Sequence, residues 1–204
     1  MTMLPAEMAA RIHPSSVVHE KAQIGDGTQI WLFVQIRENV RIGKNCLIGK
    51  NVYVDPDVVI GDQCKLMNNV SVYLGVTIED GVFCGPHVCF TNDKIPRAVN
   101  PDFSPKGPDD WKVSKTLVKT GAALGANSTI VCGVTIGKWA MVGSGAVVTH
   151  DVPDHALVLG NPARIAGWVC SCGRKVQIDE SEGKGTCSCG RTLLMDAEGV
   201  RLAS

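Results

Sequence analysis

The feature that most constrains this sequence is a period of six residues. Large apolar residues recur at every sixth position from residue 12 to 90, and again from 118 to 148. A small residue stands two positions before most of them, as Val34 does before Ile36. An α-helix repeats every 3.6 residues and a strand alternates, so neither element alone produces this pattern. Sandwich strands are the alternative, but their turns are not locked to one period. The period is typical of a β-helix, in which each repeat is a short strand and a corner.

Three such repeats would close one triangular coil of eighteen residues, so the two runs predict about six coils. The large residue would fill the prism, and the small one would sit at a corner. Stacked coils would lie at the strand spacing of roughly 4.8 Å. We assign the glycines beside the large residues to turn conformations that a Cβ disfavours. These glycines are Gly25, Gly43, Gly49, Gly61, Gly85, Gly125, Gly137 and Gly143.

Composition narrows the class of partner. Basic and acidic residues number 20 each, so the formal net charge is zero, and we expect neither nucleic acid nor membrane as a partner. Aromatic residues make up only 5% of the chain, which suits a prism too narrow for rings. The first residues lack the apolar core of a signal peptide, and we expect a cytoplasmic protein.

The sequence divides into a lead-in over residues 1–11, a β-helix over 12–168 and a polar tail over 169–204. The period breaks over residues 91–117, a stretch with four prolines and many charges. A loop this long inside a compact domain is usually functional or disordered. Because it contains one Trp and one Phe, we expect it to pack on a neighbouring subunit or a ligand.

Several longer motifs resemble one superfamily. The segments GVTIG and VGSGAVVTHDVPDHALVLGNPAR are similar to the coenzyme end of the left-handed β-helix, or hexapeptide-repeat, acyltransferases. The segments NNVSVYLGVTIEDGVFCGPHVCFTNDKIPRA and TLVKTGAALGANSTIVCGVTIG resemble, more narrowly, N-acetyltransferases of nucleotide-linked 3-amino sugars. Within that group the sequence most resembles the N-acetyltransferases of UDP-2-acetamido-3-amino-2,3-dideoxy-glucuronate, which serve surface-polysaccharide synthesis. The resemblance covers about residues 12–168.

This resemblance implies a fold, a reaction and an assembly. The fold is an all-β, left-handed parallel β-helix, and the co-substrate is acetyl-coenzyme A. The assembly is a homotrimer whose active sites lie between subunits. Backbone N–H groups on a Gly-rich wall can bind the oxyanion of the tetrahedral intermediate. The residues expected along the coenzyme are Gly125, Ala126, Lys138, Gly143, Ser144, Asn161, Pro162 and Arg164. The alternative for Lys138 and Arg164 is an exposed cation that contacts only solvent.

The same resemblance gives Asn92 the role of orienting the sugar amine, although an Asx turn that opens the loop is the alternative. His87 is a candidate general base because histidine side chains can exchange protons near neutral pH, and its alternative is a surface or substrate contact. Asn69, Tyr73 and Arg97 complete the expected substrate site. Arg97 can pair with a diphosphate or a sugar carboxylate, or else with a loop carboxylate.

Two positions depart from the pattern of these N-acetyltransferases. Leu74 stands where an acidic residue is frequent, and His87 stands where several members carry Ser. Both positions belong to the expected sugar site. An N-acetyltransferase of a dTDP-linked 3- or 4-amino sugar is therefore the main alternative.

The tail contains two matched motifs, Cys170-Ser-Cys172-Gly and Cys187-Ser-Cys189-Gly. Paired motifs of this kind resemble the knuckles of a zinc ribbon, and four thiolates can hold a structural zinc ion. The spacing of one residue is tighter than the usual two. Disulfides are the less favoured reading in a cytoplasmic chain. The cysteines of the β-helix we interpret as small buried apolar residues.

Two further classes of function remain. A γ-type carbonic anhydrase holds a metal with histidines, and His150, His155 and His87 are the candidates here. The first two lie at the exit of the β-helix, and His87 lies 63 residues before His150. A non-catalytic scaffold is the other reading, and the loop 91–117 argues against it.

Overall fold

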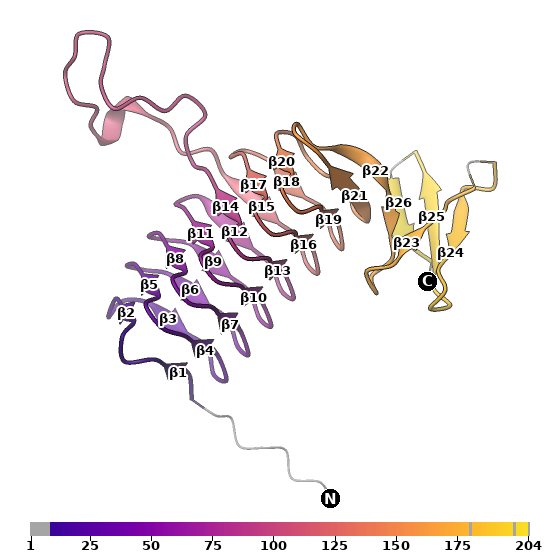
Figure 1. Cartoon of the computed structure of the whole chain (residues 1–204), viewed down its shortest axis with the longest axis horizontal. Helices are drawn as coiled ribbons and strands as arrows, with labels where there is room; N and C mark the ends of the chain where they lie inside the picture. Colours follow the sequence, from indigo (N-terminus) through magenta and orange to yellow (C-terminus); the bar gives the residue numbers. More distant parts are fainter. Residues whose placement is uncertain (1–8, 180, 198, 204) are drawn as a thin grey trace, which may run out of the picture.

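The computed structural model describes residues 9–179, 181–197 and 199–203. The chain winds into a stack of triangular coils, with a loop projecting from one side and a small β tail beyond the last coil (Figure 1). Nearly every strand of the stack has two residues, and each pairs in parallel with the strand one coil away. Residue pairs such as Arg11↔Gln29 and Gln29↔Leu47 are eighteen positions apart. The predicted left-handed parallel β-helix of about six coils is confirmed.

Three sheets form the three faces of the stack. In spatial order the first sheet contains β1 (Arg11–Ile12), β4 (Gln29–Ile30), β7 (Leu47–Ile48), β10 (Lys65–Leu66), β13 (Phe83–Cys84), β16 (Ala123–Leu124), β19 (Met141–Val142), β21 (Ala156–Leu159), β22 (Arg164–Val169) and β23 (Lys175–Val176). The second contains β2 (Val17–Val18), β5 (Gln35–Ile36), β8 (Tyr53–Val54), β11 (Ser71–Val72), β14 (Cys89–Phe90), β17 (Thr129–Ile130) and β20 (Val147–Val148). The third contains β3 (Gln23–Ile24), β6 (Arg41–Ile42), β9 (Val59–Ile60), β12 (Val76–Ile78), β15 (Thr116–Val118) and β18 (Thr135–Ile136).

The core is a column of the two residue classes that define the period. Large residues such as Ile36 and Ile48 are buried, and so are small ones such as Val34 and Val52. Cys46 belongs to the small column, and its thiol donates to the carbonyl of Gly61 at 3.1 Å. Its interpretation as a small buried residue is therefore confirmed.

The predicted role of the glycines beside the large residues is wrong. None of those glycines has a positive φ. At Gly25 an added Cβ would lie 2.6 Å from the carbonyl oxygen of Gly43, and at Gly61 it would lie 2.8 Å from the nitrogen of Asp80. These glycines therefore allow one coil to stack closely on the next. The left-handed turn falls two residues further on, where asparagine is frequent, as at Asn51 (φ 58°) and Asn69 (φ 63°).

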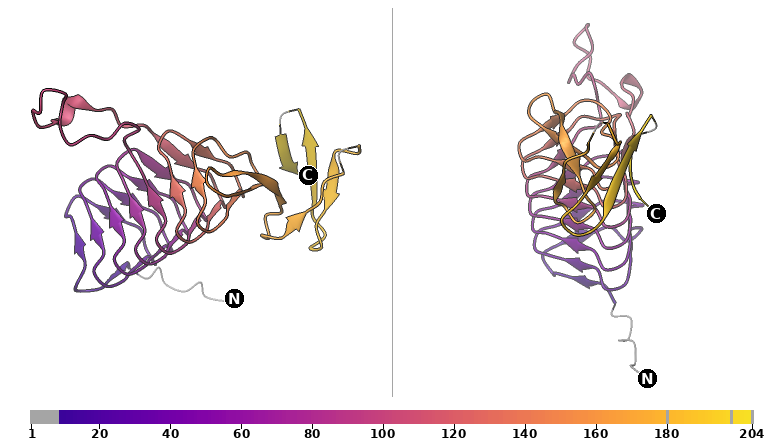
Figure 2. Two further views of the ribbon diagram at one scale, coloured as in Figure 1. Left: turned by 45° about the horizontal axis from the view of Figure 1, so that its top comes forward. Right: turned by 90° about the vertical axis from the view of Figure 1, so that its right-hand side faces the viewer.

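The loop interrupts one coil only. Phe83 pairs with Ala123 instead of a residue eighteen positions on, yet the strands above and below remain in register. The chain leaves the stack after β14 and returns at β15, passing through the 3₁₀ turn η1 (Pro108–Asp110). Residues 91–115 project away from the coils (Figures 1 and 2).

The solenoid ends where β22 folds back antiparallel onto β21. The hairpin β22–β23 extends the first sheet into the tail, whose own sheet has the order β24 (Lys184–Thr186), β25 (Thr192–Asp196), β26 (Gly199–Leu202). Figure 2 shows this tail beyond the last coil, at the end opposite β1. Most of the predicted lead-in, residues 1–8, lies outside the described residues. No helix in the described part of the chain is long and apolar enough to span a membrane.

Candidate functional site

The period assigns each candidate residue to one of three corners. The first corner follows each strand of the first sheet, the second corner follows the second sheet, and the third follows the third sheet. Side chains eighteen positions apart lie one above another at the same corner. Candidate residues can therefore come together in one chain only if they share a corner or a face.

The second corner carries Asn92 and the loop. Asn92 follows β14 directly, and its carbonyl accepts a hydrogen bond from the Ser114 N–H at 3.1 Å, which ties the outgoing strand of the loop to the returning one. Above this point lies an open hollow of about 810 Å³. It is lined by Asn92, Asp93, Pro96, Arg97, Ala98, Lys106, Gly107 and Trp111. The structure therefore places Asn92 and Arg97, two predicted substrate residues, in one concave site.

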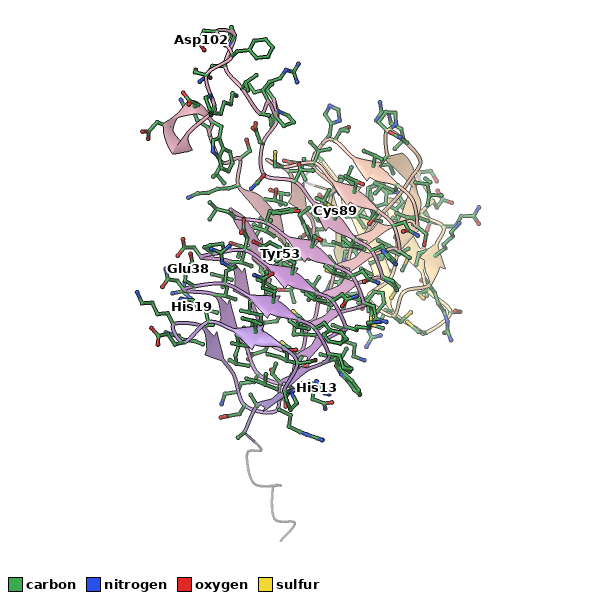
Figure 3. The ribbon with its side chains drawn as sticks, turned by 60° about the vertical axis from the view of Figure 1, so that its left-hand side comes forward. His13, His19, Glu38, Tyr53, Cys89 and Asp102 are labelled. Carbon is green, nitrogen blue, oxygen red and sulfur yellow. The ribbon has the colours of Figure 1, made fainter. Side chains whose placement is uncertain are left out.

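Tyr73 lies at the same corner, one coil below Asn92 in the stack. Its ring is 5.8 Å from the ring of Tyr53, and the Tyr53 hydroxyl donates to Asp55 at 2.7 Å. Asp55 also accepts from the Leu74 N–H at 3.0 Å. Figure 3 shows Tyr53 and Cys89 along this face, with Asp102 marking the far end of the loop above them. Tyr73 is thus held on the wall below the hollow.

The first corner carries Asn69 and His87. The Asn69 amide nitrogen lies 3.3 Å from His87 Nε2, and the Asn51 amide donates to Asn69 Oδ1 at 3.1 Å. These three side chains form a ladder on successive coils. His87 is exposed and has positive φ (62°). His87 and Asn92 therefore lie at opposite edges of the second sheet, with β14 between them.

Most of the predicted coenzyme residues stack above His87 at the first corner. Gly125 and Ala126 follow β16, Gly143 and Ser144 follow β19, and residues 160–163 follow β21. The Val147 N–H at the start of β20 donates to Gly160 O at 3.0 Å, and this bond joins the turn of residues 160–163 to the coil that precedes it. In the described part of the chain the N–H groups of Ala126 and Ser144 have no hydrogen-bond acceptor.

Some counterparts of these two amides in the stack have an acceptor, and others, such as the Asn68 N–H at the same corner, have none among the described residues. The equivalent N–H groups of Lys44 and Lys138 donate to Asp62 and Asp154, at 2.7 and 2.8 Å. The wall at the first corner therefore presents backbone donors beside Gly and Ala, with little side-chain volume. An acyl carbonyl or a pantetheine amide can be bound by such donors.

The remaining two coenzyme candidates lie elsewhere. Lys138 is exposed at the third corner, so the structure does not bring it to the wall that contains Gly125 and Gly143. Arg164 begins β22 and lines a shallow hollow with His150, Ala163 and Ile165 at the end of the second sheet. Lys138 and Arg164 belong to motifs that resemble the coenzyme end of the superfamily. Their positions in the coil, however, place them at other corners than Gly125 and Gly143.

The four tail cysteines come together. The sulfurs of Cys170 and Cys189 are 3.6 Å apart, as are those of Cys172 and Cys187, and all four lie within 4.8 Å of one another. Zn–S bonds of roughly 2.3 Å in a tetrahedron separate the sulfurs by about 3.8 Å, so the donor set fits that ion. The 3.6 Å separations are far too long for disulfide bonds.

The two knuckles have the same backbone pattern. Cys170 N–H donates to Arg174 O and Cys187 N–H donates to Arg191 O, at 2.9 and 2.8 Å. The backbone N–H of Arg191 stabilises the thiolate of Cys189 and lowers the pKa of that group to about 6. In the same cluster the pKa of Cys172 is raised to about 11 despite a hydrogen bond from the Arg174 backbone, because of desolvation and the neighbouring thiols. A lowered thiol pKa favours metal binding, because the thiolate is the ligand.

The three histidines considered for a catalytic metal lie at three different corners. His87 is at the first, and His150 follows β20 at the second. His155 is buried at the third, where its Nδ1 lies 2.9 Å from the carbonyl of Val169. Among the described residues, the tail cysteines are the one cluster of at least three metal-ligating side chains. The arrangement does not favour a carbonic anhydrase site within one chain.

Comparisons with known proteins agree with this fold. The family model for the hexapeptide repeat of succinyl-transferase matches residues 39–74 and 121–150. The model for the bacterial transferase hexapeptide (six repeats) matches residues 21–56. Over these residues the chain is similar to the hexapeptide-repeat transferases.

Individual relatives are similar over part of their length. The chain is 53% identical over 77 residues to the dTDP-3-amino-3,6-dideoxy-alpha-D-galactopyranose 3-N-acetyltransferase of Aneurinibacillus thermoaerophilus, a match that covers 38% of this chain and 39% of the relative. PerB from Caulobacter crescentus, solved in complex with CoA and GDP-perosamine, is 27% identical with a TM-score of 0.50. That match covers 79% of this chain and 58% of PerB. The acetyltransferase domain of PglB from Neisseria gonorrhoeae, at 19% identity and a TM-score of 0.53 over 78% of this chain and 58% of that one, shares the fold.

Two residues of the hollow were not among the predicted site residues, although the loop Trp was expected to pack on a neighbouring subunit or a ligand. Lys106 and Trp111 line it together with Asn92 and Arg97, although they lie nine or more positions further along the chain. The composition of the loop drew attention to its Trp and its charges. Without a period, however, nothing in the sequence indicated that these side chains face the residues at the start of the loop.

Proposed function

We propose that this protein transfers the acetyl group of acetyl-coenzyme A to the amino group of a nucleotide-linked amino sugar, in the synthesis of a surface polysaccharide. One observation carries the proposal: Asn92 lies in a cation-bearing hollow on a hexapeptide-repeat solenoid. The similarity to an N-acetyltransferase of a dTDP-linked 3-amino sugar supports it. The chain spans less than two thirds of that relative and of PerB.

The reaction needs a neutral amine, close positioning and a site for the oxyanion. The amine nitrogen attacks the thioester carbon, a C–N bond forms and the C–S bond breaks. The departing thiolate can take the proton that the amine loses. The Asn92 side-chain carbonyl accepts a hydrogen bond from the amine and directs its lone pair, and proximity of this kind can contribute roughly 7–11 kcal/mol. The free N–H groups of Ala126 and Ser144 suit the oxyanion or the pantetheine arm.

The placement of these groups suggests how the site is completed. Asn92 and the hollow lie at the second corner, whereas Ala126, Ser144 and His87 lie at the first. Two copies that set the second corner of one against the first corner of the other would join both sets. We therefore propose a homotrimer with three sites between subunits, in which His87 faces the substrate as a base or as a contact.

The acceptor is a 3-amino sugar in this proposal. The sequence resemblance indicates UDP-2-acetamido-3-amino-2,3-dideoxy-glucuronate, with Arg97 near the carboxylate or the diphosphate. The relative with 53% identity makes a dTDP-linked 3-amino sugar the second candidate, and a dTDP-linked 4-amino sugar the third. All three acceptors share the chemistry of an amine beside a nucleoside diphosphate.

A thiol-release assay with acetyl-coenzyme A tests the proposal. The panel contains the UDP-linked 3-amino uronate and dTDP-linked 3- and 4-amino sugars, with the corresponding 3-hydroxy sugar as the control. Turnover that depends on the amine is expected. If a folded, assembled protein turned over none of the amino sugars, the proposed reaction would be wrong.

Asn92→Ala is the matching variant. Loss of the carbonyl acceptor should lower kcat/KM for the amino sugar by at least tenfold, which corresponds to about 1.4 kcal/mol. The KM for acetyl-coenzyme A serves as the internal control and should stay the same. Unchanged kinetics with the sugar would remove Asn92 from the site.

We also propose that the four tail cysteines hold a structural zinc ion and that the protein works in the cytoplasm. The zinc would have four thiolate ligands and hence no open position for catalysis. The cysteines of the solenoid are all free thiols, which fits a reducing compartment.

A further inference from the structure

The hollow in the loop has the composition of an anion site with an aromatic wall. We infer that it binds the nucleoside diphosphate part of the substrate, with Arg97 and Lys106 on the diphosphate and Trp111 stacked on the base. This inference rests on the proposed function and adds the part of the substrate that Asn92 does not touch. The volume of the hollow, about 810 Å³, lies within the range of roughly 300–1,000 Å³ that small-molecule sites occupy.

The two cations have few partners within the protein, although Lys106 lies close enough to Asp110 to help lower the pKa of that carboxyl. Among the described residues neither Arg97 nor Lys106 forms an ion pair. The Arg97 guanidinium donates to its neighbour's carbonyl, Pro96 O, at 2.8 Å, which uses one nitrogen and leaves the rest of the fork available. A planar guanidinium beside a lysine ammonium is a common arrangement for binding a diphosphate.

The carboxylates nearby are already engaged by the backbone. Asp93 accepts a hydrogen bond from the Ile95 N–H at 2.9 Å. Asp110 accepts from the Gly107 N–H at 2.7 Å, and this bond is the main cause of its lowered pKa. Both acids therefore shape the loop and keep their negative charge, so a diphosphate in the hollow would bind to Arg97 and Lys106 beside two carboxylates that the backbone already holds.

The aromatic wall is Trp111, whose side chain is half-buried while lining the hollow. Phe103, the other aromatic residue of the loop, is 85% exposed and does not line it. An indole ring gives a nucleobase a stacking surface that is tolerant of base identity. The hollow should therefore select the diphosphate and the presence of a base more strongly than the type of base.

Coenzyme A also contains a nucleoside diphosphate, so the source of the ligand must be decided. The loop joins its own start to its return through Ser114 N–H and Asn92 O, which places Asn92 at the root of the hollow. A sugar whose amine reaches Asn92 would extend its diphosphate outward along Arg97 and Lys106. The Gly and Ala wall expected for the coenzyme lies at the other corner. The sugar nucleotide is therefore the occupant that we assign.

Calorimetric titration of the full chain with UDP, dTDP, GDP, uridine and inorganic pyrophosphate measures the binding directly. At least one nucleoside diphosphate should bind more tightly than uridine or pyrophosphate. Lys106→Met and Trp111→Ala should each weaken that binding by about tenfold. Lys106→Arg should largely restore it. Lys65→Met and Trp31→Ala, which change an exposed lysine of the first face and an exposed tryptophan at the first corner beside β4, are the matched controls and should bind as the wild type does.

Steady-state kinetics separates the two sources of the diphosphate. Both hollow variants should raise KM for the sugar nucleotide and leave KM for acetyl-coenzyme A unchanged. A raised KM for acetyl-coenzyme A alone would overturn the assignment, as would wild-type binding in both variants once circular dichroism shows them folded.

If no amino sugar is acetylated but the variants lose nucleotide binding, the nucleotide site stands and the acetyl-transfer proposal fails. If an amino sugar is acetylated and both variants have wild-type kinetics with it, the acetyl-transfer proposal stands and the nucleotide site fails.

Discussion

Ser128 is a fully buried polar residue within the column of small core residues. It occupies the small inward position that Val88 and Ala146 fill one coil below and one coil above. Its hydroxyl is fully buried and has no hydrogen-bond partner among the described residues. A buried hydroxyl without a partner loses its hydration and gains nothing in return. The solenoid therefore tolerates this serine without gaining stability from it.

Replacing Ser128 with Ala should raise the free energy of unfolding by about 1 kcal/mol, because the change removes the unpaired polar group. Urea denaturation followed by circular dichroism measures this. Thr28 gives the matched control: its hydroxyl donates to Gly43 O at 2.8 Å and accepts from Cys46 N–H at 2.9 Å. Thr28→Val should therefore lower stability by about 1–2 kcal/mol. A destabilised Ser128→Ala variant would show that the hydroxyl has a partner after all.

At the scale of the repeat, two kinds of glycine have different physical roles. Gly61 has an ordinary backbone, but a Cβ there would lie 2.8 Å from Asp80 N and 2.9 Å from Glu79 C. Gly81, at the same corner, has φ +67°, and a Cβ there would meet nothing nearer than 3.9 Å. The first glycine is required by stacking and the second by backbone conformation.

Gly61→Ala should therefore destabilise the solenoid by about 1–3 kcal/mol, since backbone atoms of the next coil must move. Gly81→Ala should lower stability by only about 1–2 kcal/mol, the strain of an alanine in the left-handed region. Thermal unfolding of the two variants side by side gives the comparison. A larger loss at Gly81 than at Gly61 would mean that conformation, not stacking, limits the corner.

The elements that repeat were predictable from the sequence, and the element that does not repeat was only partly so. The large residue at every sixth position, such as Ile36 or Ile48, specifies a strand, because each of these side chains must fill the same prism. The interruption after residue 90 predicted the loop. The meeting of Arg97 with Lys106 and Trp111 depends on contacts within the loop, such as the Val99↔Pro105 bridge, and no period encodes them.

At the scale of the whole molecule, the candidate site is divided. Of the residues expected to hold the sugar, Asn92, Arg97 and Tyr73 lie at the second corner. Asn69 and His87 lie at the first corner, together with most of the residues expected to hold the coenzyme. A face of the prism separates the two groups within one chain. The function proposed for this protein therefore depends on its assembly, and an obligate monomer could not bring Asn92 to the Ala126 and Ser144 amides.

The tail depends on a different source of stability. Among the described residues of the tail, its buried cluster consists of Val176, Leu193 and Val200 together with Cys170 and Cys187. Trp168 packs against both this cluster and the core of the solenoid, so it joins the two. A cluster this small rarely folds without a staple, and the four sulfurs are the staple available.

Removing the metal should therefore unfold the tail and leave the solenoid intact. A strong chelator at neutral pH should release about one zinc per chain, and hydrogen exchange should lose protection over residues 170–203 but not over the strands of the coils. Cys189→Ser should reproduce this loss. Cys89→Ser, which alters a half-buried thiol of the second sheet, is the control and should keep the zinc. Because the thiolates must be deprotonated to bind, zinc should also be released as the pH falls. A tail that stays protected with no metal bound would contradict the zinc assignment and leave the four thiols as packing groups.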